Sequence, residues 1–181
     1  PDQVMAVRLT AEGNDSLNLN VSFPIDNEEN VKSKNLGKNE TIVVEENTIT
    51  VKGSLQDNQM MFNGKLTVAD TVGGRVKEAA DGTSLEIKGA KEVVMFVAAD
   101  TNYDDVYPDY RTQDTEDTLD SRVEGLIGKA SKAGYEAVKA NHQQDYKGIF
   151  DRVELDLGQK DVLPKTTDTL LSSYNNGTAA E

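Results

Sequence analysis

The chain has 181 residues, enough for one well-buried core, and its 32 acidic residues against 19 Lys and Arg give a formal net charge of −13. This negative charge repels phosphate backbones and anionic lipids, so nucleic acid and membrane partners are not expected. No stretch approaches the roughly 18 consecutive apolar residues of a transmembrane helix. The absence of cysteine excludes disulfides, thiolate metal sites and thiol nucleophiles, and it leaves the compartment open.

The first hundred residues contain short segments in which apolar and polar side chains alternate, the pattern of strands with one buried face. The expected strands are residues 5–9, 17–23, 41–44, 48–51, 60–68, 75–78, 84–88 and 92–99. The sequence AEGND at 11–15 predicts a hairpin turn between the first two strands, and Asp81 with Gly82 predicts another. Short strands at this spacing make the chain mainly β and favour an antiparallel β-sandwich, with a barrel as the alternative.

The last of these strands differs from the others because it is continuously apolar, with the sequence VVMFVAA at 93–99. It is expected to be a central strand that is covered on both faces. An acidic, tyrosine-rich segment without either period follows at 100–118, and we interpret it as a long surface loop. The sandwich, together with this loop, is expected to span residues 1–118.

Two helices are predicted after the loop, and together they form a connector over 119–150. The first has one apolar face, takes Asp117 or Thr118 as its N-cap and ends at Gly134. The second carries an apolar stripe made of Tyr135, Val138, His142, Tyr146, Ile149 and Phe150.

The period changes from helical to alternating in the segment 151–158, where Val153, Leu155 and Leu157 fall on one face. We therefore expect a strand here that returns to the sheet. Residues 159–181 are interpreted as the start of a linker that begins a further helix.

Three stretches carry a resemblance to a known family: VVMFVAADTNY at 93–103, GYEAVKANHQQDYKGIFDRVELDLG at 134–158 and LPKTTDTLLSSYNNG at 163–177. From His142 onward, the second follows the pattern H-x-x-D-Y-x-x-L-F-x-R-V-x-L-x-L-G, except that Ile149 replaces Leu. Lys165 lengthens a P-T-D turn by one residue, and Asp100 stands where a small residue is commoner. On these residues the chain resembles the N-terminal β-sandwich region of glycoside hydrolase family 95, the α-L-fucosidases and α-L-galactosidases.

The resemblance implies an excised segment, in which an incomplete supersandwich-like β-sandwich is followed by a helical connector and one returning strand. In this family the chain then enters an (α/α)6 barrel, which would be the segment's partner and would bring it to an oligosaccharide substrate. The implied reaction is inverting hydrolysis of terminal α-L-fucosides or related sugars, with the acid and base on the barrel. No catalytic residue, metal or cofactor is then expected in the segment. The implied parent is a bacterial enzyme, extracellular or at the cell surface, and sheet edges left open by truncation are candidates for homodimer contacts.

The acidic loop contains three candidate substrate-binding residues, Thr101, Asn102 and Tyr103. Tyrosine faces stack on sugars, and carboxamides and carboxylates bond hydroxyl groups, so these residues fit a loop that approaches the sugar pocket of a neighbouring barrel.

The same loop opens with the D-x-N-x-D spacing of a calcium site, at Asp100, Asn102 and Asp104. An EF-hand also needs Gly at the sixth position and Glu at the twelfth, where this chain has Asp105 and Arg111. We therefore expect a solvated acidic loop and no metal site.

His142 is the single histidine of the chain. Because it lies on the predicted apolar stripe, we interpret it as a half-buried residue that bonds a carboxylate or carbonyl where helix and sheet meet. Asp151 and Arg152 are interpreted as residues of the same seam, and they are expected to orient the connector.

Three functions remain open on the sequence: a structural segment of a fucosidase-like enzyme, an independent carbohydrate-binding module, and an enzyme with a convergent site of its own. A row of exposed aromatic residues would favour the binding module. The chain has no Trp and six Tyr, three of them at positions 103, 107 and 110.

Overall fold

The computed structural model describes residues 2–23, 37–155 and 166–175. The chain divides into two compact units, residues 1–145 and 146–181, which are treated separately below. Within the described residues, none of the helices is long and apolar enough to span a membrane.

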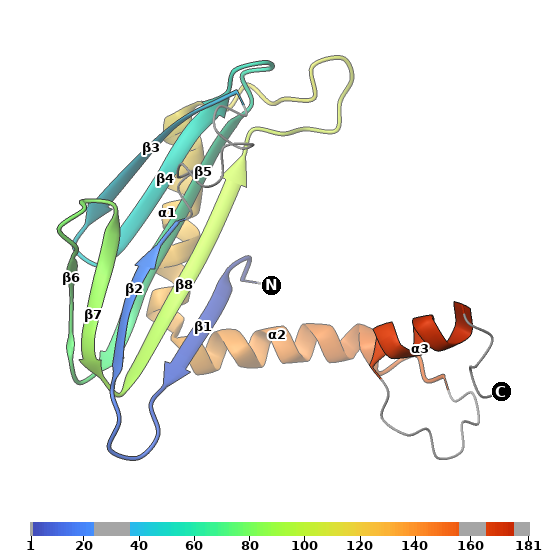
Figure 1. The fold of residues 1–181 in the computed structure, drawn as a ribbon. Helices are drawn as coiled ribbons and strands as arrows, with labels where there is room; N and C mark the ends of the chain where they lie inside the picture. Colours follow the sequence, from blue (N-terminus) through green and yellow to red (C-terminus); the bar gives the residue numbers. More distant parts are fainter. Residues whose placement is uncertain (1, 24–36, 156–165, 176–181) are drawn as a thin grey trace. The chain divides into compact units, whose positions relative to one another are not determined.

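The described residues form eight strands and three helices, labelled in Figure 1. The strands are β1 (Met5–Thr10), β2 (Leu17–Ser22), β3 (Lys38–Glu45), β4 (Thr48–Leu55), β5 (Met61–Val72), β6 (Arg75–Glu78), β7 (Ser84–Ala90) and β8 (Glu92–Thr101). The helices are α1 (Glu116–Ala133), α2 (Tyr135–Phe150) and α3 (Thr167–Asn175). Every strand predicted from residues 5 to 99 is present.

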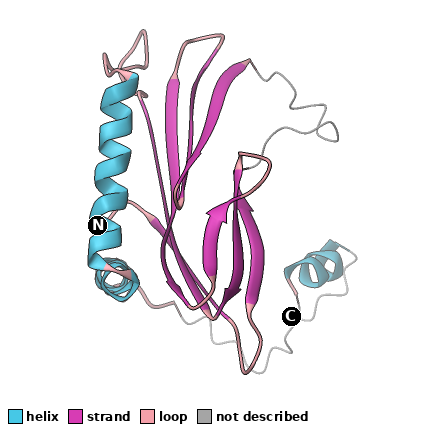
Figure 2. Ribbon diagram, turned by 90° about the vertical axis from the view of Figure 1, so that its left-hand side faces the viewer, coloured by secondary structure: helices cyan, strands magenta, loops and turns pink. Residues whose placement is uncertain are grey.

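The strands form two antiparallel sheets, one in the order β1-β8-β5-β4-β3 and the other in the order β2-β7-β6. Figure 2 shows the two layers of strands, with α1 beside the larger sheet. The inward side chains of both sheets form one apolar core, which includes Ile49, Val68, Leu85, Ile87 and Val93. The predicted antiparallel β-sandwich is therefore confirmed.

β8 is an interior strand of the larger sheet, second from its edge, because it pairs with β1 on one side and β5 on the other, whereas β5 is the middle strand. Val93 and Met95 belong to the core between the sheets, whereas Val94 and Phe96 belong to a second core beneath α1. The prediction that both faces of this strand are covered is confirmed. Its outer cover is the first helix of the predicted connector.

The predicted hairpin between the first two strands is wrong. β1 pairs with β8, and Leu9 lies opposite Val93, whereas β2 pairs with β7, so the segment 11–16 crosses from one sheet to the other. A turn sequence fixes a local reversal of the chain but not the partner of each strand, which depends on distant apolar residues. The hairpin at Asp81 and Gly82 is present between β6 and β7.

Helix α1 begins earlier than predicted, because Thr115 is its N-cap. The Thr115 hydroxyl accepts the amide hydrogen of Thr118 at 3.2 Å, so Thr118 belongs to the first turn and is not the cap. The helix ends as predicted at Gly134, which has φ of 81° and donates its N–H to the Ala130 carbonyl. Its buried face consists of Leu119, Val123, Ile127 and Ala130.

Helix α2 is present, but most of its predicted apolar stripe is exposed. Val138 is buried and Tyr135 is half-buried, whereas the side chains from residue 139 to 150 are exposed. His142 is therefore an exposed residue, and the prediction that it is half-buried is wrong. Apolar residues at helical spacing form a buried stripe only where a neighbouring surface covers them.

The predicted returning strand at 151–158 does not form in its described part. Residues 151–155 are a turn followed by irregular backbone, and the side chains of Val153 and Leu155 are 77% and 79% exposed. Alternation alone does not make a strand, because the backbone also needs a neighbouring strand for its hydrogen bonds. Residues 156–158 lie outside the described residues. The predicted further helix is present as α3.

Candidate functional site

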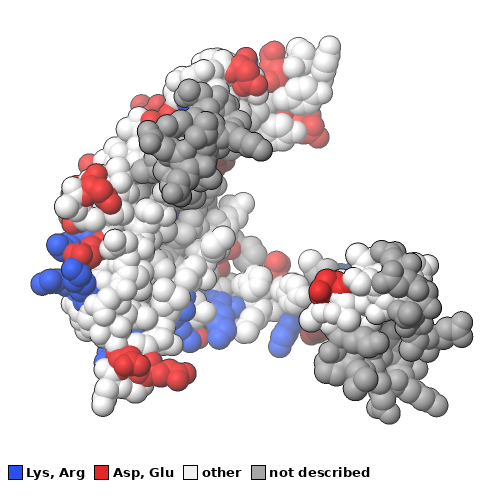
Figure 3. All heavy atoms as spheres, viewed as in Figure 1, with Lys and Arg blue, Asp and Glu red and all other residues white. Residues whose placement is uncertain are grey.

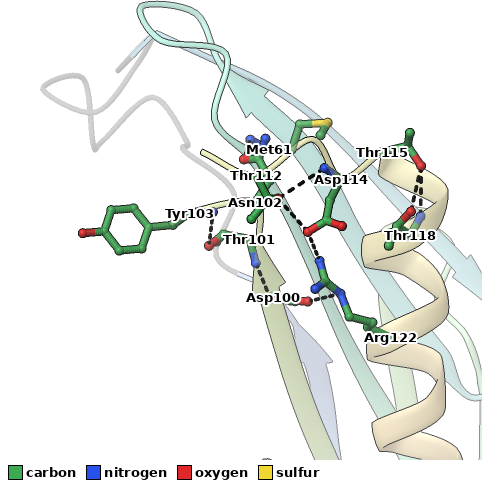
Figure 4. A network of polar contacts seen from close by, with 10 residues as sticks. All are labelled: Met61, Asp100, Thr101, Asn102, Tyr103, Thr112, Asp114, Thr115, Thr118 and Arg122. Carbon is green, nitrogen blue, oxygen red and sulfur yellow. Dashed lines mark hydrogen bonds and ion pairs between the residues drawn. The ribbon is translucent and has the colours of Figure 1, made fainter. Parts of the chain in front are cut away.

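The loop between β8 and α1 is the part of the first unit in which polar and aromatic side chains gather. It covers residues 102–115, because β8 continues to Thr101 and α1 begins at Glu116. The predicted loop spanned 100–118, and the structure assigns residues 100–101 of that range to β8 and 116–118 to α1. All three predicted substrate-binding residues, Thr101, Asn102 and Tyr103, lie where β8 passes into the loop (Figure 4).

Asn102 anchors the base of the loop to the start of β5. Its side chain is 4% exposed, and its Oδ1 accepts the Met61 amide hydrogen at 2.8 Å. Its own backbone N–H donates to the Met61 carbonyl at 3.3 Å, and its carbonyl accepts the Thr112 amide hydrogen at 2.8 Å. Asn102 therefore connects both ends of the loop to the neighbouring strand. Its side-chain oxygen Oδ1 already accepts a hydrogen bond within the protein.

The loop folds back on itself above this anchor. Tyr103 and Arg111 form an isolated antiparallel bridge. Beyond it, the amide of Asp104 donates to the Tyr110 carbonyl at 3.0 Å, and the amide of Tyr110 donates to the Val106 carbonyl at 2.9 Å. The sequence in this segment has neither helical nor strand periodicity, so its hairpin-like order was not predicted.

Arg122 of α1 joins the two ends of the loop, as Figure 4 shows. Its Nε lies 2.9 Å from Oδ2 of Asp100, and its Nη2 lies 2.6 Å from Oδ2 of Asp114. Asp114 Oδ2 also accepts the hydroxyl hydrogen of Thr112 at 2.6 Å. The Thr112 hydroxyl, followed by the Arg122 guanidinium, lowers the pKa of Asp114 and keeps it ionised.

Neither Arg122 nor Asp114 was singled out from the sequence. The available signal was an arginine in the second turn of a helix that follows a run of carboxylates. An arginine in such a position has several carboxylates within reach, but the sequence does not indicate which of them it binds.

The outer part of the loop exposes most of its large side chains. We define the tyrosine tip as Tyr103, Val106, Tyr107 and Tyr110, of which Tyr107 is 81% exposed. The rings of Tyr107 and Tyr110 meet edge to face, with centroids 6.2 Å apart. Figure 3 shows carboxylates, in red, on this loop at the upper right.

These tip carboxylates are Asp104, Asp105 and Asp109, the first half-buried and the others exposed. Asp105 accepts the hydroxyl hydrogen of Tyr103 at 3.4 Å. The tip therefore combines flat aromatic faces with negatively charged hydrogen-bond acceptors, both open to solvent.

The calcium-like spacing at the loop entrance does not bring its ligands together. Asp100 faces Arg122 and the Thr101 amide, whereas the Asn102 side chain faces Met61. Among the described residues, no group of three or more His, Asp or Glu side chains is arranged to hold a metal ion.

A second polar cluster fixes α1 on the sheet below the loop. Lys65 of β5 is buried, and its Nζ lies 2.7 Å from Glu124 and 3.2 Å from Asp120. Asn63 donates from Nδ2 to Asp120 at 3.0 Å. Burial disfavours the charge of Lys65, but hydrogen bonds to Glu124 and Asp120 outweigh it and raise the pKa of the amine.

Carboxyl groups with a clearly shifted pKa are all shifted downward in the described residues. They are Asp81, Glu86, Asp114, Asp120 and Asp168. A general acid in glycoside hydrolysis needs the opposite shift, so that it carries a proton at working pH. These five groups accept hydrogen bonds at neutral pH and are unsuited to donate a proton.

Among the open hollows formed by the described residues, two lie near α1. The larger, about 740 Å³, lies along β3 and β4 and is lined in part by the ion pair of Lys52 with Glu116. The other, about 510 Å³, lies beside Asp100 and Arg122. The residues of the tyrosine tip line neither hollow.

Two comparisons with known proteins bear on this arrangement. The model of the family "Glycosyl hydrolase family 65, N-terminal domain" matches residues 1–106, a stretch that contains all eight described strands. A protein of Aspergillus niger named "Probable alpha-fucosidase A" is 28% identical over 123 residues. The match covers 64% of this chain and 15% of that protein, so the chain spans a small part of its relative's length.

Both comparisons support the predicted resemblance to an N-terminal region of a glycoside hydrolase. The matching model carries the family number 65, so the family number 95 stays a prediction. The relative is fungal, and a bacterial source likewise stays a prediction.

Proposed function

The chain belongs to the family of N-terminal domains of glycosyl hydrolase family 65, and from this premise we propose that it is the non-catalytic N-terminal sandwich of an α-fucosidase-type enzyme. The observation that carries the proposal is the family match over residues 1–106, which takes in both sheets of the sandwich. The name of the Aspergillus niger relative supports α-fucosides as the substrate class. In this proposal the catalytic groups lie in a helical barrel outside the chain.

The sandwich would act as a rigid support beside the catalytic barrel. Its larger sheet is held between two apolar cores, and α1 is fixed to the outer face by Val123, Ile127 and the charged groups around Lys65. The loop 102–115 is in turn fixed to β5 and α1 through Asn102 and Arg122. A binding surface on such a support keeps its geometry, because its backbone is already ordered before a ligand arrives.

The chemistry that the sandwich would support is hydrolysis with inversion. An inverting glycosidase separates its acid and base by about 6.5–9.5 Å, which leaves room for a water molecule opposite the leaving group. Asp114 and Asp120 have lowered pKa values, so their carboxyl groups are ionised, and they accept hydrogen bonds from hydroxyl, amide and cationic groups inside the chain. Donation of a proton to the glycosidic oxygen would therefore fall to a group on the barrel.

The exposed tyrosines favour a second candidate function, an independent carbohydrate-binding module. Tyr103, Tyr107 and Tyr110 are all exposed on one loop, which is the aromatic feature expected of a binding module. The two candidates differ in where most of the binding energy lies. A module binds its sugar alone with useful affinity, whereas a supporting domain alone makes only weak contacts and needs the barrel beside it for tight binding.

An assay of the full-length gene product tests the proposed function. We expect it to release L-fucose from α-L-fucosides, and proton NMR of the first-formed sugar should detect the β-anomer. The 181-residue chain alone is expected to release none. Release of sugar by the chain alone, or a full-length product inactive on both α-L-fucosides and α-L-galactosides, contradicts the proposal.

A further inference from the structure

The large side chains of the tyrosine tip are exposed to solvent and do not take part in either apolar core. Tyr107 is 81% exposed, and its ring contact is with Tyr110, another residue of the tip. Elsewhere in the first unit, Tyr135 is half-buried and its ring lies 4.5 Å from the Arg8 guanidinium. Exposed aromatic groups on one loop commonly mark a contact surface.

The chemistry of the tip fits a sugar. A tyrosine ring offers a flat apolar face for the C–H groups of a pyranose and a hydroxyl group that bonds to water or ligand. The carboxylates of Asp105 and Asp109 lie exposed in the same short segment and can accept hydrogen bonds from sugar hydroxyls.

The charge of the tip restricts the class of sugar. The tip carries three aspartates, Asp104, Asp105 and Asp109, and its neighbouring basic residue Arg111 is half-buried at the bridge with Tyr103. The fourth aspartate of the loop, Asp114, is paired with Arg122 at the base. Sialic acid, uronic acids and sulfated sugars carry negative charge, so they are repelled at this surface. A neutral sugar meets no such penalty.

The base of the loop keeps the tip ordered. The side chain of Asn102 accepts a hydrogen bond from the Met61 amide, and its backbone N–H donates one to the Met61 carbonyl. The next residue, Tyr103, forms the bridge with Arg111. Binding to a surface that is already ordered loses less conformational entropy than binding to a flexible loop.

We propose that the tyrosine tip is a contact site for neutral oligosaccharides, and that its carboxylates exclude anionic ones. The proposal rests on the proposed function, because it takes its substrate class from there, and it adds a location and a selectivity. Tyr107 and Tyr110 supply the stacking faces, and Asp105 and Asp109 supply the acceptors and the charge.

The experiment is an NMR titration of the isotope-labelled 181-residue chain with fucosyllactose. We expect saturable shifts of the amide signals of residues 103–111, with a dissociation constant in the millimolar range. Double substitution Tyr107→Ala and Tyr110→Ala should weaken binding about fivefold or more, since aromatic stacking contributes about 1 kcal/mol. Tyr174→Ala is the matched control, because Tyr174 of α3 is 77% exposed and lies outside the loop.

A second arm tests the selectivity with sialyllactose. The native chain should bind this anionic sugar at least about fivefold more weakly than fucosyllactose. Substitution of both Asp105 and Asp109 by Asn should narrow that difference to about twofold, because the amides keep acceptor oxygens and lose the charge. Equal binding of the two sugars by the native chain contradicts the selectivity.

Two results overturn the contact site itself. One is the absence of tip shifts at about 50 mM fucosyllactose, where a millimolar site would be nearly saturated. The other is a shift of tip signals with protein concentration alone, which would identify the tip as a contact between two copies. The assay of the full-length product decides the proposed function separately. Tip binding by the chain together with an inactive full-length product would leave the contact site standing and remove the fucosidase assignment.

Discussion

The Nε of Arg122, in the second turn of α1, lies 2.9 Å from Oδ2 of Asp100, the next-to-last residue of β8. The same guanidinium reaches Asp114 near the far end of the loop. One side chain therefore connects the strand before the loop, the end of the loop and the helix after it. The arrangement closes the loop at its base, where the Thr112 amide also donates a backbone hydrogen bond to the Asn102 carbonyl.

Removal of this connection should loosen the loop more than it destabilises the fold. Arg122 is nearly half exposed, so we expect Arg122→Ala to lower the global unfolding free energy by about 0.5 kcal/mol or less. Local opening should increase, because the two carboxylates lose their shared partner. Hydrogen exchange of the Thr112 amide measures this, and we expect protection to fall about tenfold.

Arg75→Ala provides the matched control for this variant, because Arg75 is an exposed arginine on β6, in the other sheet. It should leave the exchange of the Thr112 amide unchanged. Equal hydrogen-exchange protection of the Thr112 amide in Arg122→Ala and in the native chain would show that backbone hydrogen bonds alone hold the loop.

The buried amine of Lys65 should matter more than any exposed charge. Lys65→Ala leaves Asp120 and Glu124 near each other without the intervening cation and opens space in the seam between α1 and β5. We expect a loss of about 2 kcal/mol in the free energy of unfolding, below the range for a fully buried pair because both carboxylates are partly exposed. Urea denaturation followed by circular dichroism measures the loss.

Lys65→Met separates the charge of this residue from its volume. Methionine fills most of the same space, so a loss much smaller than that of the alanine variant would assign most of the effect to packing. Lys132→Ala, at an exposed position in the last turn of α1, should change stability by less than about 0.5 kcal/mol. If Lys65→Ala lowered the unfolding free energy by no more than this, the ion pairs of Lys65 with Asp120 and Glu124 would not hold α1 on the sheet.

The sequence predicted those features of the fold that depend on neighbouring residues. Alternation located the earlier strands, a continuous apolar run located β8, and Asp81 with Gly82 located the turn between β6 and β7. What it missed depends on distant partners. The pairing of β1 with β8 requires apolar residues some ninety positions apart. The segment 151–155 has the pattern of a strand but lacks a neighbouring strand among the described residues.

The candidate site was predicted in position but not in arrangement. Aromatic and carboxamide residues singled out Thr101 to Tyr103, yet the sequence could not distinguish the buried side chain of Asn102 from the exposed ring of Tyr103. That distinction arises because β8 ends beside Met61, whose backbone amide needs a partner. The exposure of His142 has a similar cause, since its position on a stripe does not determine whether another surface covers it.

Acid should weaken the smaller sheet through Glu86 of β7. The ammonium groups of Lys77 and Lys88 lower the pKa of this carboxyl from 4.5 to about 2. Because the folded pKa is the lower one, the folded state binds fewer protons, and the stabilisation is fully present above about pH 4.5. It is lost as pH falls from 4.5 to about 2. Glu86→Gln should remove this component of the pH dependence.

Unfolding curves of the native chain and of Glu86→Gln between pH 7 and about 2 measure the difference. The two stabilities should differ most near neutral pH and converge in acid. Glu12→Gln, at an exposed carboxyl between β1 and β2, controls for the general loss of negative charge. Parallel curves for the Glu86 variant and the native chain would contradict the assignment of the shift to these lysines.

Substitution by alanine should change the unfolding free energy in opposite directions at two glycines. A Cβ at Gly53 of β4 would lie 1.9 Å from the Asn39 carbonyl oxygen of β3, so the two strands would have to separate. Alanine at Gly128 of α1 meets nothing within 4 Å and removes a flexible residue from a helix interior. We expect Gly53→Ala to cost more than about 2 kcal/mol and Gly128→Ala to add about 0.5–1 kcal/mol to the unfolding free energy. Thermal and urea denaturation of both variants decide this, and a neutral Gly53→Ala would mean that the edge strand β3 moves aside without loss.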